Sequence, residues 1–161
     1  MQLYNPDENE VVVKQDLKYN IENELLYYFV NNKIDDFGLK QLNFKLINTR
    51  NDKGNIVKTF IPSVINKKTI VIKVEIAYEN FKPIFCAYYK RDNTPVKKIY
   101  YNNYSNYGQY NFPLRITEIN YISAKDSSIS RKIYSDVKVD FQANHSNFDF
   151  QIPPTAKKIN Y

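Results

Sequence analysis

The sequence has no tryptophan, three glycines, one cysteine and one histidine among its 161 residues. Because a disulfide needs two cysteines, none can form within the chain. Three glycines leave little material for the loops that hold phosphates, and no P-loop or dinucleotide-binding pattern occurs. No stretch is apolar over the length of a membrane-spanning helix. These absences exclude a disulfide-stabilised scaffold and the common nucleotide-binding folds.

The scarcity of histidine and cysteine also limits catalytic chemistry. A nucleophile and histidine relay would need His145, which lies in a polar turn and is predicted to be on the surface. The adjacent carboxylates of Asp7-Glu8 and Asp35-Asp36 lie at predicted turns or helix ends, where acidic residues are routine. Cys86 lies within an apolar segment and is predicted to be a buried thiol. We therefore expect no enzyme, no catalytic residue, no metal site and no cofactor.

Aromatic residues are the most abundant unusual feature of the composition. The chain has 15 tyrosines and 10 phenylalanines, and 43% of its residues are hydrophobic against 25% charged. Tyrosine and phenylalanine favour strands, so the composition predicts a mainly β protein. The length suits one domain over residues 1–161.

The first part of the chain predicts a hairpin followed by a helix. Two short apolar segments flank the turn at 5–10, which contains Pro6. Asn20 can cap a helix that continues to about Asn32, with apolar residues at helical spacing. The segment from Met1 to Pro6 lacks the features of a secretion signal, and we expect that a leader and some structure preceded it.

From Gly38 onward the pattern predicts successive strands joined by short polar turns. A turn at 51–54 separates two apolar segments, and alternation is clearest from Thr69 to Ile76. The phase of the strand after Phe112 changes near Ile119, which predicts a β-bulge, and a last long strand is predicted to end near Phe141. An antiparallel meander must cover its apolar face or close on itself. A curved, unclosed half-barrel with a helical plug is the simplest arrangement.

Several strand ends resemble those of the LolA-like family of outer-membrane lipoprotein carriers. The similar segments are Tyr4-Asn5-Pro6, Glu10 to Val13, Phe60-Ile61-Pro62, Phe81-Lys82-Pro83, Phe112 to Ile116, Tyr134 to Val139 and Phe148 to Pro153. Family members begin with a helix and strands that have no counterpart here. The chain therefore resembles the later two-thirds of the family's domain.

The resemblance implies a half-barrel with a helical lid and an apolar cavity that receives lipoprotein acyl chains or another lipid. It also implies a periplasmic or envelope location in a Gram-negative bacterium, with envelope proteins that load and unload the carrier. We expect a monomer. The candidate cavity residues are Leu25, Tyr28 and Phe29 of the lid, and Ile70, Ile72, Val74, Ile76, Phe85, Ala87, Tyr89, Leu114 and Ile116 of the strands.

Two other functions fit the composition. The net charge of +6 and the tyrosine-rich segments 88–91 and 96–104 would suit a β-module that stacks nucleic-acid bases beside lysines. The lysines are scattered, however, and a basic exterior equally suits anionic lipid surfaces, so nucleic acid is not the expected partner. The third hypothesis is a LolA-like envelope sensor or interaction domain that carries no lipid.

Overall fold

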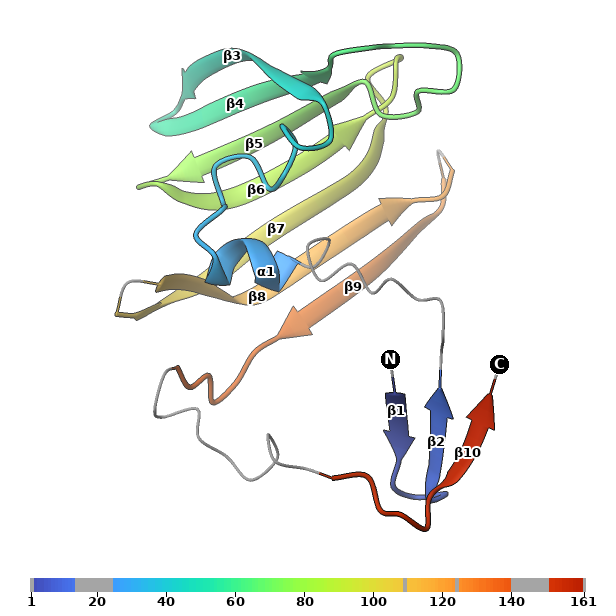
Figure 1. Cartoon of the computed structure of the whole chain (residues 1–161). Helices are drawn as coiled ribbons and strands as arrows, with labels where there is room; N and C mark the ends of the chain where they lie inside the picture. The colour runs from blue at the N-terminus through green and yellow to red at the C-terminus, as the bar shows by residue number, and fades with distance from the viewer. Residues whose placement is uncertain (1, 14–24, 109, 124, 140–150, 161) are drawn as a thin grey trace. The chain divides into compact units, whose positions relative to one another are not determined.

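The strands form two separate sheets in the computed structural model, which describes residues 2–13, 25–108, 110–123, 125–139 and 151–160 (Figure 1). One compact unit comprises Leu25–Val137, and a smaller unit is built from the two ends of the chain. Each unit is described by itself below. The prediction of a single domain over residues 1–161 stays a prediction.

The larger unit contains a seven-stranded antiparallel sheet in which every strand pairs with the next one along the chain. The strands are β3 (Phe44–Asp52), β4 (Asn55–Pro62), β5 (Lys73–Glu79), β6 (Lys82–Tyr89), β7 (Pro95–Tyr107), β8 (Tyr110–Tyr121) and β9 (Ser127–Ile133). Within the described part of the chain, β3 and β9 are the two edges and do not pair with each other. The predicted mainly β fold with an unclosed meander is therefore confirmed.

Local turn chemistry explains the hairpin between β3 and β4. The backbone N–H of Gly54 donates to Asn51 Oδ1 at 3.0 Å. Lys53 and Gly54 have φ angles of 52° and 90°, the left-handed region that two-residue hairpin turns use. The predicted turn at 51–54 is confirmed.

The structure corrects three details of the strand prediction. The strand predicted from Thr69 begins at Lys73, and a turn precedes it in which Asn66 Oδ1 accepts from the backbone N–H of Lys68 at 2.8 Å. Strand β8 has no bulge, since its register with β7 is unbroken, and Ile119 lies on the opposite face from Ile116. The last long strand ends at Ile133, well before the predicted end near Phe141.

The helix α1 (Leu25–Val30) lies over β7 and β8 in Figure 1 and leads into a loop that runs to β3. The predicted cap at Asn20 lies outside the described residues. After Val30 the chain leaves the helix through Asn32, whose φ of 51° ends the helical path.

The smaller unit is a three-stranded sheet of β1 (Gln2–Asn5), β2 (Glu10–Val13) and β10 (Lys157–Asn160). β1 and β2 form the predicted hairpin, and β10 pairs with β2 in parallel. The ends of the chain are joined by this pairing and by an ion pair at 3.4 Å between Lys157 and Glu10.

Candidate functional site

The register divides the side chains of the large sheet between two faces. Val74 is opposite Phe60, Ile76 is opposite Cys86, and Cys86 is opposite Ile99. Because side chains alternate along a strand, these residues share one face, which we call the inner face. Its buried residues are Phe60, Val74, Ile76, Tyr78, Cys86, Ile99, Tyr101, Phe112 and Ile116.

Residues 25–43, which we call the plug, cover the inner face. Their buried side chains are Tyr28 and Phe29 of α1 and Phe37 and Leu39 of the following loop. Phe29 is central, because its ring contacts the rings of Phe37, Tyr101, Tyr104 and Phe112 at centroid distances between 5.5 and 6.4 Å. The inner face is thus filled by the chain's own aromatic side chains.

Polar contacts fix the loop of the plug to the sheet. The Tyr78 hydroxyl lies within hydrogen-bond distance of two carbonyl oxygens, at 3.0 Å from Ile34 and 2.6 Å from Asp35. Lys58 Nζ lies 3.5 Å from Asp35 Oδ1. Burial and the nearby Asp35 raise the pKa of Tyr78, so its hydroxyl remains a donor at neutral pH. Two strands therefore anchor the middle of the plug.

Backbone geometry makes Gly38 necessary in the plug. A Cβ at this position would lie 2.6 Å from the Tyr28 hydroxyl, and its φ is 75°. The preceding Phe37 also has a positive φ, 46°, which is uncommon for a bulky residue. The plug therefore has two consecutive residues at positive φ, packed against the ring of Tyr28.

Tyr101 carries an unsatisfied polar group beneath the plug. Its side chain is 1% exposed, and its hydroxyl has no hydrogen-bond partner in the described part of the chain. Burial raises its pKa well above the usual value, so the hydroxyl is neutral. A buried, unpaired hydroxyl costs free energy, on the order of 1–3 kcal/mol.

The buried thiol of Cys86 belongs to the same face. It is enclosed, and burial raises its pKa to about 12. The thiol is therefore protonated at neutral pH and acts as a small apolar group. This confirms the prediction of a buried cysteine.

Half of the predicted cavity residues lie together. Tyr28, Phe29, Val74, Ile76 and Ile116 are buried in one cluster, and Leu114 packs against it. Sequence reasoning missed six further sheet residues of this cluster: Phe60, Tyr78, Cys86, Ile99, Tyr101 and Phe112. The alternation of side chains along β5 would have indicated Cys86, had its pairing with Ile76 been predicted.

The prediction that all of the candidates form one wall is wrong. Phe85, Ala87 and Tyr89 are opposite Ala77, Glu75 and Lys73, so they lie on the outer face of the sheet. Because both faces of β6 are apolar, its sequence does not show which of its residues point to the inner face.

Two other predicted cavity residues, Ile70 and Ile72, lie in the loop before β5, and the side chain of a third is not described. Ile70 is exposed in the loop before β5. Ile72 is half-buried outside the strand, where its N–H donates to the Tyr89 carbonyl at 2.9 Å. The side chain of Leu25 lies outside what the structure describes.

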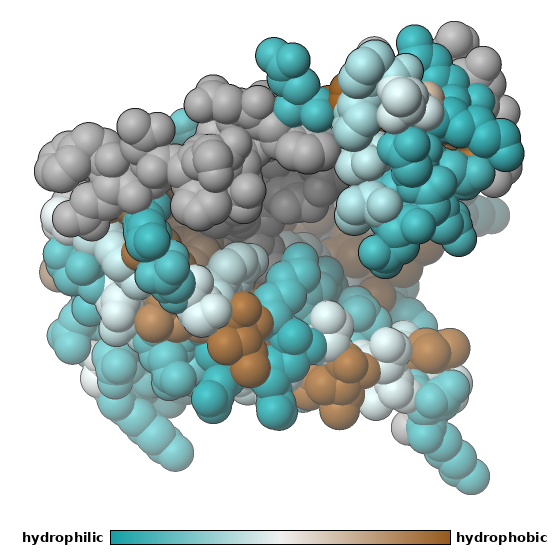
Figure 2. Space-filling model, turned by 90° about the horizontal axis from the view of Figure 1, so that it is seen from below, coloured by the Kyte–Doolittle hydropathy of each residue, from teal (hydrophilic) through white to brown (hydrophobic). Residues whose placement is uncertain are grey.

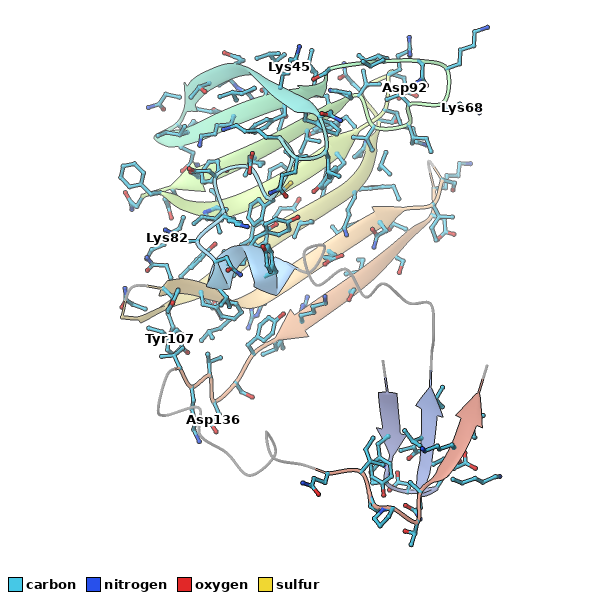
Figure 3. The ribbon with its side chains drawn as sticks, viewed as in Figure 1. Lys45, Lys68, Lys82, Asp92, Tyr107 and Asp136 are labelled. Carbon is cyan, nitrogen blue, oxygen red and sulfur yellow. The ribbon has the colours of Figure 1, made fainter. Side chains whose placement is uncertain are left out.

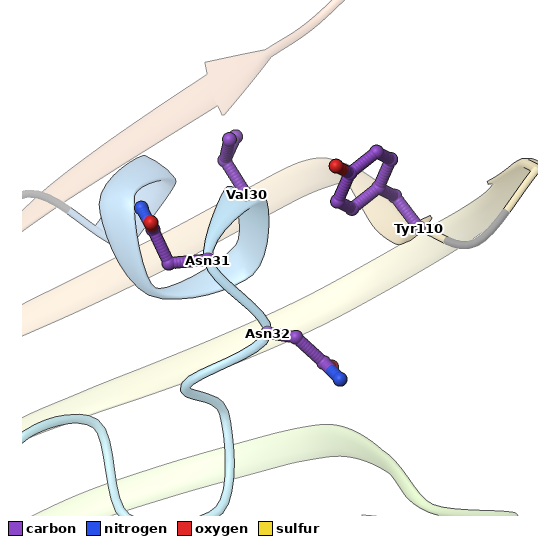
Figure 4. Close-up of a pocket in the computed structure, with 4 residues that line it drawn as sticks. All are labelled: Val30, Asn31, Asn32 and Tyr110. Atoms are coloured by element: carbon purple, nitrogen blue, oxygen red, sulfur yellow. The ribbon is translucent and has the colours of Figure 1, made fainter.

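Two pockets of the larger unit lie beside the cluster. One, of about 250 Å³, is lined by Val30, Asn31, Asn32 and Tyr110 at the end of α1 (Figure 4). The other, of about 290 Å³, is lined mostly by polar residues near the β5–β6 turn, among them Glu79, Lys82 and Asn102. Neither is an apolar chamber inside the sheet. On the face shown in Figure 2, the coloured hydrophobic residues form small separate groups among hydrophilic ones.

An ion pair borders the inner face where the sequence suggested only strand. Lys97 Nζ lies 2.7 Å from Glu118 Oε2, and both side chains are partly buried.

The described residues contain no cluster of histidine, cysteine, aspartate or glutamate that could hold a metal ion. No helix in the described part of the chain has the length and apolarity that crossing a membrane requires.

Two solved structures are among those with weak similarity to this chain. A LolA superfamily protein from Nitrosomonas europaea matches with a TM-score of 0.38 and 17% identity, over 58% of this chain and 46% of its own. A domain from Vibrio parahaemolyticus, named as an outer membrane lipoprotein-sorting protein, matches with a TM-score of 0.39 and 16% identity, over 59% of this chain and 43% of its own.

This chain spans less than half the length of either protein. No family model and no curated protein matches the sequence. The functional inference is therefore drawn from the geometry of the plug and the inner face.

Proposed function

We propose that the protein is a non-enzymatic binder of lipid acyl chains, and that it carries a lipid or a lipoprotein in the bacterial cell envelope. An acyl chain would occupy the inner face after the plug moves away. The observation that supports this is the aromatic plug itself: an open apolar sheet is covered by the side chains of a six-residue helix and a loop. So short a helix has little stability of its own.

The free energies of the plug and of an acyl chain are comparable. Burying one large apolar side chain contributes about 1.5–3 kcal/mol, so Tyr28, Phe29, Phe37 and Leu39 together contribute roughly 6–12 kcal/mol. A sixteen-carbon chain gains about 12 kcal/mol from burial before ordering costs. Exchange between the two is therefore close to balance, which suits a carrier that must also release its cargo.

Two features lower the stability of the closed plug. The positive φ of Phe37 is strained, and the Tyr101 hydroxyl is unpaired while the plug covers it. Removal of the plug relieves the strain at Phe37, whereas the Tyr101 hydroxyl stays unpaired beneath an acyl chain, which has no hydrogen-bonding group. Within this proposal the acyl chain contacts Val74, Ile76, Leu114 and Ile116, together with Phe60 and Tyr101.

A fluorescent sixteen-carbon fatty acid tests the proposal, with displacement by unlabelled palmitate. The wild-type protein should bind it saturably. Phe29→Ala removes the central ring of the plug and should strengthen binding at least about tenfold, because a large-to-small change at a buried phenylalanine costs the closed state about 3–5 kcal/mol.

Phe81→Ala is the matched control for this experiment. Phe81 is 86% exposed at the β5–β6 turn and does not belong to the buried cluster, so its removal should leave the affinity unchanged. If neither the wild-type protein nor a folded Phe29→Ala variant binds the probe, the carrier proposal is wrong. An envelope interaction domain that carries no lipid would then remain.

A further inference from the structure

Three loops and the chain before β3 lie at one end of the strands of the large sheet. Because the strands are antiparallel and follow one another along the chain, the β4–β5, β6–β7 and β8–β9 connections all lie at the same end of the strands. The register places Pro62 opposite Phe44 at this end, and the N–H of Ser63 donates to the Asn43 carbonyl at 2.7 Å. We call Leu42 and the connections at 63–72, 90–94, 122–123 and 125–126 the loop rim.

Exposed aliphatic side chains gather on the loop rim. The most exposed are Val64 at 73%, Ile122 at 68% and Ile70 at 66%, and Leu42 and Ile65 are exposed as well. They come from separate segments of the chain. Neighbouring strands lie about 4.8 Å apart, so the rim extends over about 24 Å from β3 to β8. Exposed apolar groups that recur on successive loop tips indicate an interaction surface.

The loop rim is also basic. Lys67, Lys68, Lys90, Arg91 and Lys125 are all exposed, and none forms an ion pair within the described ranges. The rim has two acidic residues, Asp92 and Asp126. Asp92 accepts hydrogen bonds from the N–H and the hydroxyl of Thr94 within its own turn. Lys68 and Asp92 are seen at this end of the strands in Figure 3.

We propose that the loop rim docks the protein on a membrane surface that contains anionic lipids. Aliphatic side chains on loop tips can enter the headgroup region, while lysine and arginine beside them contact lipid phosphates. The exposed apolar residues of the rim are aliphatic, whereas binding of single-stranded nucleic acid uses exposed aromatic rings for stacking. The pattern therefore favours lipid over nucleic acid. The inference does not depend on acyl-chain binding at the inner face.

Sedimentation with vesicles of phosphatidylcholine, with and without phosphatidylglycerol, tests the proposal on the whole chain. The wild-type protein should bind the anionic vesicles and lose binding as salt increases. The Lys67→Gln/Lys68→Gln variant should bind about fivefold more weakly for each charge removed. Ile70→Ser/Ile122→Ser should reduce the partition coefficient by about tenfold.

Matched controls come from exposed residues on the edge strands. Ile47 and Ile133 are 56% and 67% exposed on β3 and β9, and Arg131 and Lys132 are exposed on β9. Ile47→Ser/Ile133→Ser should leave partitioning unchanged, and Arg131→Gln/Lys132→Gln should reduce it much less than the rim variant. Absence of wild-type binding, equal binding to both vesicle types, or equal effects of rim and control variants would overturn the proposal.

Discussion

The ring of Phe37 is stacked on the ring of Tyr101, with 5.5 Å between centroids and 7° between planes. One ring belongs to the plug and the other to the middle of β7, so this pair joins the cover to the sheet. In this arrangement the backbone of Phe37 has a positive φ, and the hydroxyl of Tyr101 has no hydrogen-bond partner among the described residues. The closed arrangement therefore carries two local costs at one contact.

Removing the hydroxyl of Tyr101 should stabilise the folded protein. Tyr101→Phe keeps the stacked ring and removes the unpaired donor, so the free energy of unfolding should rise by about 1 kcal/mol. Tyr78→Phe is the control, because that hydroxyl is bonded to carbonyl oxygens of the plug. Its loss should lower the free energy of unfolding by about 1 kcal/mol. Urea denaturation measures both, and a loss of stability in Tyr101→Phe would show that its hydroxyl has a partner.

A methyl group at Gly38 should loosen the plug. Gly38→Ala places a Cβ 2.6 Å from the Tyr28 hydroxyl and keeps a positive φ. Gly54→Ala has the same backbone problem, at a φ of 90°, but nothing lies within 4 Å of the added atom. We expect Gly38→Ala to cost about 1–3 kcal/mol more than Gly54→Ala in thermal or urea unfolding. Equal costs would mean that Tyr28 moves aside freely.

Stability should fall at alkaline pH through the buried ionisable groups. The pKa of Cys86 is raised from 9.0 to about 12, so the unfolded chain loses this proton before the folded chain does. The stabilisation is complete below pH 9 and is lost as the pH rises towards 12. Tyr78 and Tyr101 have raised pKa values as well and act in the same direction.

Cys86→Ala isolates the contribution of the thiol. Between pH 9 and 12 the free energy of unfolding of the variant should fall less steeply, by up to about 1.4 kcal/mol per pH unit, which corresponds to one proton. Urea unfolding across this pH range measures the two slopes. Identical slopes would mean that Cys86 ionises alike in both states.

Much of the sheet follows from local sequence. The turn at 51–54 has its glycine at the second position of the two-residue hairpin loop, where a positive φ is required, and the following segments alternate as strands do. The start of β5 could not be read in this way, because the apolar alternation continues backward through Ile72 and Ile70. The side-chain hydrogen bonds of Asn66 hold a turn at 66–69, where the alternation predicts the start of the strand.

The candidate site was less predictable than the sheet. β6 has apolar residues on both faces, so Phe85 and Ala87 could be assigned to the wrong side. Phe37 and Leu39 were missed because the loop that holds them has no periodic pattern. Their burial depends on contacts with β7 and with α1, which sequence spacing does not reveal.

Hydrogen exchange of the plug on binding an acyl chain tests the central claim most directly. The backbone N–H of Lys33 bonds to the Tyr28 carbonyl at 2.7 Å, and that of Phe44 bonds to the Leu39 carbonyl at 2.9 Å. Saturating palmitate should increase exchange in residues 31–43 and leave strands β5 to β8 protected. Unchanged or slower exchange in residues 31–43 with bound palmitate would contradict displacement of the plug.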